Sequence, residues 1–154
     1  MSDDRSVAFA FDELAHAEGV TFGPSSWRPV PQQQIDEFAD LTGDHNPIHV
    51  DEDLAAASPF GTRIAHGLLT LSLVVPHLKE TFKVTGSGTN VNYGLNRVRF
   101  PAPVPSGSRI RTSGRVLEVT DLGNGYQLVV AVTFEVEGGN KPVCVAEFVF
   151  RYYA

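Results

Sequence analysis

The spacing of hydrophobic residues changes character once along the chain, at the glycine-rich stretch 86–88. Before it, apolar residues recur with the period of a helix. The residues after Pro31 predict a first helix that ends at Gly43, because proline favours the first helical position and glycine the position after the last. Its apolar face is formed by residues at the 3.6-residue period, namely Ile35, Phe38, Ala39 and Thr42.

The most hydrophobic segment runs from Gly67 to about Phe82. It is apolar nearly all round, which predicts a helix buried on every side. Its apolar residues include Leu68, Leu69, Leu71, Leu73, Val74 and Val75. Pro76 predicts a kink, because it leaves the carbonyl of Ser72 without a helical hydrogen bond.

Shorter elements are expected around these two helices. Residues 11–17 predict a short helix, and residues 20–30 an irregular strand interrupted by Gly23-Pro24. Asp51 precedes an acidic first turn and predicts another short helix, which Ser58-Pro59 ends.

Beyond residue 88 the pattern becomes that of strands separated by turn residues. The four predicted strands are 90–100, 108–119, 126–137 and 142–153. Short turns between strands imply antiparallel neighbours. The fold class is therefore α+β, with an antiparallel sheet wrapped around one long buried helix.

Length and composition narrow the classes of protein. The 154 residues predict a single domain over 1–154, with poor order expected, if anywhere, in the first ten residues. A net charge of −6 without a basic block argues against nucleic-acid binding. The single Cys144 excludes an intramolecular disulfide, and no signal peptide or membrane-length apolar run is apparent. We expect a cytoplasmic protein without a membrane partner.

The chemistry gathers in residues 43–53, where Asp44 and His49 flank an Asn46-Pro47 turn. Pro47 fixes its own φ and restricts the residue before it, so the turn sets the separation between acid and base. A purely structural interpretation is available, because an Asp-x-Asn-Pro stretch also closes turns. A rigid pair of titratable groups beside an apolar helix is, however, what acid–base chemistry next to a carbonyl requires.

Two other kinds of site are less well supported. His45 and His49 have the spacing of ligands on one helical face, but Pro47 between them disfavours that helix, and no zinc or calcium motif is present. A nucleophile is disfavoured because there is no G-x-S-x-G motif, and Cys144 lies within an apolar strand. We expect no metal and no cofactor.

Two motifs resemble those of a known family. They are Gly43-Asp44-x-Asn46-Pro47-x-His49-x-Asp51 and, after a spacer, Phe60-Gly61-x-x-Ile64-Ala65-His66-Gly67-Leu68-Leu69. Both resemble the MaoC-like dehydratases, the (R)-specific enoyl-CoA hydratases with a hot-dog fold. The stretch 92–104 is similar to the subgroup named after the nodulation protein NodN.

The resemblance implies that Asp44 and His49 are the catalytic pair and that Gly67 donates a backbone N–H to the thioester oxygen. It places Asn46 and His66 among the substrate-binding residues. Some hydratases use a further serine on the central helix; that position here is Val75, with Ser72 nearby, so the serine is not carried over. The implied enzyme is a hydro-lyase acting on acyl-CoA or an acyl-carrier-linked chain, and hot-dog relatives form homodimers.

Two alternatives stay open: a non-catalytic acyl-thioester binder and a hot-dog thioesterase. The intact Asp44/His49 pair favours the hydratase, because a binder has no need to activate water. Finally, the chain is acidic overall, but residues 97–115 contain five arginines and no acidic residue: Arg97, Arg99, Arg109, Arg111 and Arg115. Arg97 and Arg99 share one face of the predicted strand. One interpretation is an outer sheet face made soluble by charge; the lack of balancing acids favours the other, in which they bind the phosphates of CoA or an acidic carrier.

Overall fold

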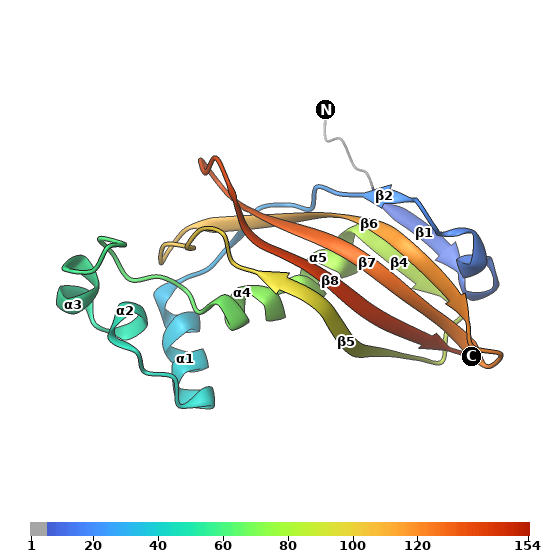
Figure 1. The fold of residues 1–154 in the computed structure, drawn as a ribbon, viewed down its shortest axis with the longest axis horizontal. Helices are drawn as coiled ribbons and strands as arrows, with labels where there is room; N and C mark the ends of the chain where they lie inside the picture. The colour runs from blue at the N-terminus through green and yellow to red at the C-terminus, as the bar shows by residue number, and fades with distance from the viewer. Residues whose placement is uncertain (1–5) are drawn as a thin grey trace.

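The computed structural model describes residues 6–154. A six-stranded sheet has the order β2-β6-β7-β8-β5, with β3 also paired to β6. It curves around the central helices α4 and α5, while α1, α2 and α3 extend beyond one end of the sheet (Figure 1). The helical elements are η1 (Phe11–His16), α1 (Gln32–Thr42), α2 (Pro47–Val50), α3 (Glu52–Ala56), α4 (Gly67–Ser72) and α5 (Val74–Thr81).

The strands confirm the expected α+β architecture. They are β1 (Val7–Ala10), β2 (Thr21–Phe22), β3 (Arg28–Pro29), β4 (Phe82–Thr85), β5 (Thr89–Arg99), β6 (Arg109–Asp121), β7 (Gly125–Val136) and β8 (Pro142–Tyr153). All pairs of the large sheet are antiparallel. In β7 and β8, alternate residues are buried, because successive side chains of a strand point to opposite faces. The inward-facing set forms the core against the helices.

The central helix is divided, and one of its sides is exposed. Leu73 separates α4 from α5, three residues before Pro76, where a kink was predicted. Pro76 thereby falls in the first turn of α5, where the missing N–H costs no helical hydrogen bond. The prediction of burial on every side is wrong: Leu68 is 63% exposed and Val75 38%. These residues share a face with Ser72, which is also exposed.

Three elements were not predicted. β1 and β4 form a separate parallel pair, with Val7 opposite Phe82. Its two strands are four residues each, too short for a clear alternating pattern. The single turn α2 was read as part of a rigid turn, although Pro47 occupies a first-turn position there. In the other segments the predicted elements are confirmed to within a few residues.

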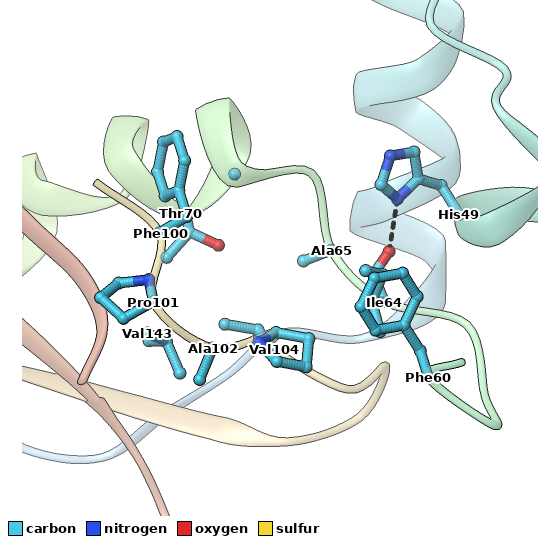
Figure 2. Close-up of a pocket in the computed structure, with 12 residues that line it drawn as sticks. His49, Phe60, Ile64, Ala65, Thr70, Phe100, Pro101, Ala102, Val104 and Val143 are labelled. Carbon is cyan, nitrogen blue, oxygen red and sulfur yellow. Dashed lines mark hydrogen bonds between the residues drawn. The ribbon is translucent and has the colours of Figure 1, made fainter. Parts of the chain in front are cut away.

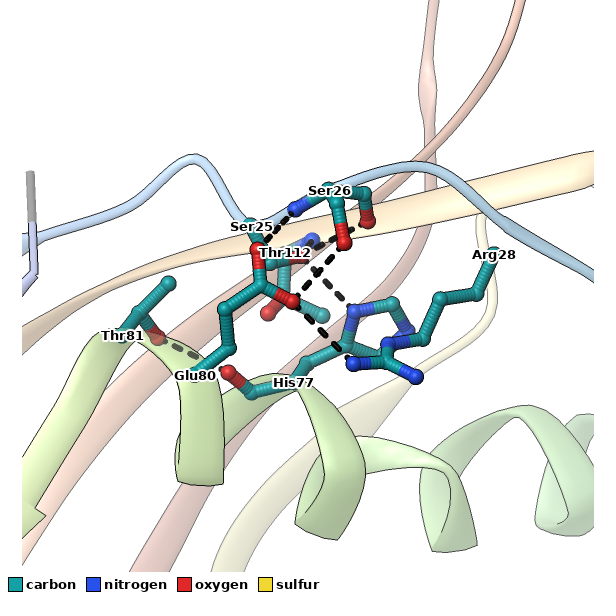
Figure 3. A network of polar contacts seen from close by, with 7 residues as sticks. All are labelled: Ser25, Ser26, Arg28, His77, Glu80, Thr81 and Thr112. Atoms are coloured by element: carbon teal, nitrogen blue, oxygen red, sulfur yellow. Dashed lines mark hydrogen bonds and ion pairs between the residues drawn. The ribbon is translucent and has the colours of Figure 1, made fainter. Parts of the chain in front are cut away.

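The segment between β2 and β3 lies across α5 and is held there by polar contacts (Figure 3). Ser25 Oγ lies 2.7 Å from His77 Nδ1, and it accepts a hydrogen bond from the Thr112 N–H at 3.0 Å. Glu80 accepts hydrogen bonds from the N–H and hydroxyl of Ser26 and forms an ion pair with Arg28. His77 is 1% exposed, and burial lowers its pKa to about 4.

Candidate active site

The loop that carries Asp44 starts where α1 ends. Gly43 adopts a left-handed conformation, with φ of 77°, and its N–H bonds the carbonyl of Ala39, which stops the helix. Asp44 Oδ1 then accepts a hydrogen bond from the Asn46 N–H at 3.4 Å. Asp44 therefore closes the turn, as the structural interpretation of the motif expects, while its side chain stays exposed.

Asn46 forms the beginning of α2. Its side-chain oxygen accepts a hydrogen bond from the Ile48 N–H at 3.3 Å, and Pro47 follows as the first helical residue. This is the ordinary N-cap arrangement. The structure thus gives Asn46, which was expected to bind substrate, a cap that positions His49 one turn further on.

His49 is held with one ring nitrogen committed to the backbone. It is 7% exposed, and its Nδ1 lies 2.7 Å from the carbonyl oxygen of Ile64. A carbonyl only accepts hydrogen bonds, so Nδ1 carries a proton and the lone pair of the neutral ring is on Nε2. Burial lowers the pKa of His49, partly offset by the Ile64 hydrogen bond. A neutral imidazole with a free Nε2 is what a general base requires.

His66 packs directly against His49. The two imidazole rings are stacked, with centroids 3.8 Å apart and planes 28° apart. His66 Nε2 lies 2.9 Å from the backbone carbonyl oxygen of Asp44. One carboxylate or ring-nitrogen atom from each of Asp44, His49 and His66 lies within 4.8 Å of the others. That spacing lets one water molecule hydrogen-bond to Asp44 and His49 together.

The same three residues have the chemistry of metal ligands, but the stacking of the rings is unfavourable for one. The lone pair of an imidazole nitrogen lies in the plane of its ring, and two stacked rings with centroids 3.8 Å apart and planes 28° apart are poorly oriented to direct both lone pairs at one ion. His45, considered as a ligand from the sequence, is instead exposed and bonds Asp40 at 2.7 Å. The arrangement fits a shared water better than an ion held by both rings.

His49 and Gly67 border a cavity of about 290 Å³ (Figure 2). Gly67 is the first residue of α4, and no side chain among residues 6–154 caps that helix end. A Cβ at Gly67 would lie 2.8 Å from the Phe100 ring, so the close approach requires glycine. The remaining walls are largely apolar: Phe60, Ile64, Ala65, Thr70, Phe100, Pro101, Ala102, Pro103, Val104 and Val143. Such a cavity suits a short apolar chain.

Arg97 and Arg99 lie away from this group. Arg97 is opposite Glu147 in the β5–β8 register and Arg99 is opposite Val145, whereas the neighbouring position Ala146 faces the core. Directly opposite residues share a face, so both arginines lie on the outer face of the sheet. The prediction that they share a face is confirmed; a contact with substrate stays a prediction.

Two other arginines of the cluster, Arg109 and Arg111, have acidic partners. Arg109 pairs with Glu137, and Arg111 pairs with Glu135. The sequence suggested a band without balancing acids, which is wrong for these two: Glu135 comes from β7 and Glu137 from the residue just after it. Arg97 and Arg99 form no ion pair among the described residues.

Comparison with known proteins places the chain in a family. Residues 13–138 match the family described as "MaoC like domain". The chain belongs to the MaoC-like family. A protein from Mycobacterium tuberculosis H37Rv named 3-hydroxyacyl-thioester dehydratase Z is 52% identical over 143 residues, covering 92% of this chain and 95% of its own. Nodulation protein N of Rhizobium leguminosarum bv. viciae is 44% identical over 136 residues, covering 85% and 83%.

The fold agrees with this assignment. The unliganded (R)-hydratase from Pseudomonas aeruginosa superimposes with a TM-score of 0.66 at 26% identity, covering 86% of this chain and 79% of that one. The hot-dog expectation and the resemblance to the NodN-like subgroup are both confirmed. No helix within residues 6–154 is long and apolar enough to cross a membrane.

Sequence reasoning missed two features of the site. The carbonyl of Ile64, which orients His49, carries no signal in the sequence because every residue has a carbonyl. Phe100, which packs on Gly67, lies in the stretch 92–104 already singled out by resemblance, but its role depends on how the loop after β5 folds back.

Proposed function

We propose that this protein hydrates 2-enoyl thioesters and, in reverse, dehydrates (R)-3-hydroxyacyl thioesters. The observation that carries the proposal is the spacing of the Asp44 carboxylate and the His49 imidazole, within 4.8 Å of each other beside an apolar cavity. The similarity to a protein named 3-hydroxyacyl-thioester dehydratase supports the reaction type. The enzyme is then a hydro-lyase that needs no redox chemistry.

The proposed mechanism follows from the two ring nitrogens of His49, of which Nδ1 is bonded to the Ile64 carbonyl and Nε2 is free to accept a proton. A water between Asp44 and His49 gives a proton to the pair, with His49 Nε2 as the free acceptor, and its oxygen bonds to C3 of the enoyl chain. The electrons of the C2–C3 double bond move toward the thioester oxygen, and the pair returns one proton to C2. The sum is addition of H and OH, so the catalyst is unchanged.

Gly67 is proposed to stabilise the charge that develops on the thioester oxygen. Its N–H stands at the start of α4, where helical N–H groups have no helical partner and the peptide dipoles favour negative charge. Loss of one such donor typically costs about 10²- to 10³-fold in rate. The cavity bordered by both Gly67 and His49 would hold the first carbons of the acyl chain.

The test is a spectrophotometric assay of hydration with crotonyl-CoA and a longer enoyl-CoA. Wild-type protein should consume the enoyl absorbance, whereas Asp44→Asn and His49→Ala should not, with circular dichroism unchanged. Retention of a tenth of wild-type activity by both variants would refute the roles of the pair. Thiol release without hydration would favour the thioesterase, and binding without turnover the non-catalytic binder.

We further propose a homodimer formed at β5. This strand pairs with β8 on one side only, and exposed apolar side chains lie along it and on the adjoining face of α4 and α5. The group comprises Leu68, Val75, Val91, Tyr93 and Leu95. A hollow of about 260 Å³ lies between that helix face and β5. Edge strands and apolar patches of this kind are normally covered.

Light scattering at micromolar concentration tests the dimer. Wild-type protein should have twice the mass of one chain, and Leu95→Glu should reduce it to one. Leu41→Glu is the matched control, because Leu41 is 84% exposed on α1 and lies outside the group. A wild-type monomer would refute the dimer. Cytoplasmic location remains a prediction from the composition.

A further inference from the structure

His66 was expected to bind substrate, but its contacts are with the other parts of the site. It is 2% exposed and immediately precedes α4. Its ring stacks on that of His49 and also packs against Phe38 of α1, with the ring centroids of His66 and Phe38 4.9 Å apart. It is not among the residues that line the cavity. A side chain enclosed in this way is poorly placed to touch an acyl chain.

The hydrogen bonds of His66 fix its protonation pattern. Its Nε2 faces the Asp44 carbonyl, which only accepts, so Nε2 carries a proton. Its Nδ1 is buried without a hydrogen-bond partner among residues 6–154. The neutral tautomer suits this arrangement, because a proton on Nδ1 would be a buried donor left unbonded.

His66 is thus linked to each part of the proposed catalytic group. Its edge bonds the residue that carries the acid, its face supports the base, and its own peptide leads into Gly67. The backbone carbonyl of His66 also accepts hydrogen bonds from the N–H and hydroxyl of Thr70, which ties the residue to the first turn of α4.

We propose that His66 is a positioning residue: its imidazole holds Asp44, His49 and the Gly67 N–H in register without contacting substrate. The inference rests on the proposed hydratase activity and assigns a role within that site. Geometry of this kind affects rate strongly, since misplacement of a reacting group by about 1 Å can cost about 10²-fold.

Three variants separate the two contacts of the ring. His66→Phe keeps a flat ring against His49 but loses the bond to Asp44; His66→Gln keeps a donor and loses the stacking; His66→Ala loses both. We expect kcat to fall about 10- to 100-fold in each single-contact variant and further in His66→Ala, with KM within twofold of wild type. His16→Phe, on exposed η1, is the matched control and should be unchanged.

A pH profile adds a readout that a merely structural residue would not move. Protonation of one of two stacked imidazoles opposes protonation of the other, so His66 lowers the pKa of His49, whereas Asp44 raises it. His66→Phe removes the first effect, so the acid limb of the kcat profile should shift to higher pH. ¹⁵N NMR of the wild-type protein should show His66 protonated at Nε2 and bare at Nδ1, with no substrate needed.

The outcomes are distinct. A rise in KM with kcat intact would overturn the proposal in favour of substrate contact, and unchanged kcat in both His66→Phe and His66→Gln would overturn it outright. A His66 protonated at Nδ1 alone would do the same, whether or not the variants fold. If wild-type protein hydrates no enoyl thioester, the proposed function fails, while the NMR result still tests the geometry of His66.

Discussion

His49 and His77 are both buried along the central helices. They differ in the surroundings of Nε2, the ring nitrogen that makes no hydrogen bond to the part of the chain that the structure describes. His49 packs near the start of α4 and bonds the Ile64 carbonyl through Nδ1. His77 lies on α5 and meets the Ser25 hydroxyl through Nδ1. Burial is the main cause that lowers the pKa of both. Their other nitrogens have different surroundings: the group around His49 includes a carboxylate and borders a cavity, whereas His77 Nε2 is buried without a partner within residues 6–154.

The comparison shows that a lowered pKa does not by itself mark a catalytic residue. Burial favours the neutral ring in both, but of the two only His49 borders the cavity and lies within 4.8 Å of the Asp44 carboxylate, which is the basis for its proposed role. His77 is covered by the segment between β2 and β3, which Ser26 and Arg28 bind to Glu80 (Figure 3). We interpret it as part of the packing of that segment.

The strongest test applies the same substitution at both histidines. His49→Gln should reduce kcat by about 10³-fold or more, because removal of a general base and of its water contact costs rate directly, with little loss of Tm. His77→Gln should lower Tm and leave the kcat of the folded enzyme near wild type. Enoyl-CoA hydration and thermal unfolding measure both. Equal losses of kcat in the two variants would remove the distinction.

The second test uses acid stability. The unfolded chain protonates this histidine below about pH 6.5, but folded His77 only below about pH 4. The unfolded state therefore binds more protons between these values, and stability falls by about 3 kcal/mol as pH drops from 6.5 to 4. Urea unfolding against pH should show a flatter dependence for His77→Gln.

His45→Gln is the control for this measurement. The hydrogen bond to Asp40 raises the pKa of His45, so its contribution is present at low pH and is lost as pH rises. Its removal should change the pH dependence in the opposite direction. If stability falls as steeply in acid for His77→Gln as for the wild type, burial of His77 is not the cause of that fall.

The third test concerns Gly67, the first residue of α4, which also borders the cavity. In Gly67→Ala the new Cβ meets the Phe100 ring, and we expect kcat to fall about tenfold through displacement of the N–H, in line with the rate losses caused by small misplacements. Gly67→Ala with Phe100→Ala removes the clash and should recover part of kcat. No recovery in the double variant would show that Phe100 is not the obstacle.

The smallest effect tests whether the site extends to the outer face of the sheet. Arg97→Glu with Arg99→Glu should raise KM for a CoA substrate several-fold with little change in kcat, the signature of lost uniform binding. Salt should reduce the effect by screening. Arg109→Glu with Arg111→Glu is the comparison, because these arginines already pair with Glu137 and Glu135. An unchanged KM at low ionic strength would leave Arg97 and Arg99 as ordinary surface residues.

Much of this molecule was predictable because its signals are local. Helical spacing and a glycine stop identified α1, and alternating residues between turns identified β5 to β8. The parallel β1–β4 pair was not predictable, since two four-residue strands distant in sequence depend on each other for hydrogen bonds. The exposed face of α4 and α5 was missed because hydrophobicity does not tell whether a residue is buried within one chain or left for a partner.

The sequence by itself determined the rigid Asp44–Asn46–Pro47 turn, because proline and Asx geometry act over a few bonds. It also determined that His49 follows one helical turn later. Only the tertiary structure decided that His66, 17 residues beyond, stacks on His49, that the Ile64 carbonyl selects its tautomer, and that Glu137 and Glu135 neutralise two arginines. These contacts arise when separate segments are packed together, and their energies depend on distances that no local pattern specifies.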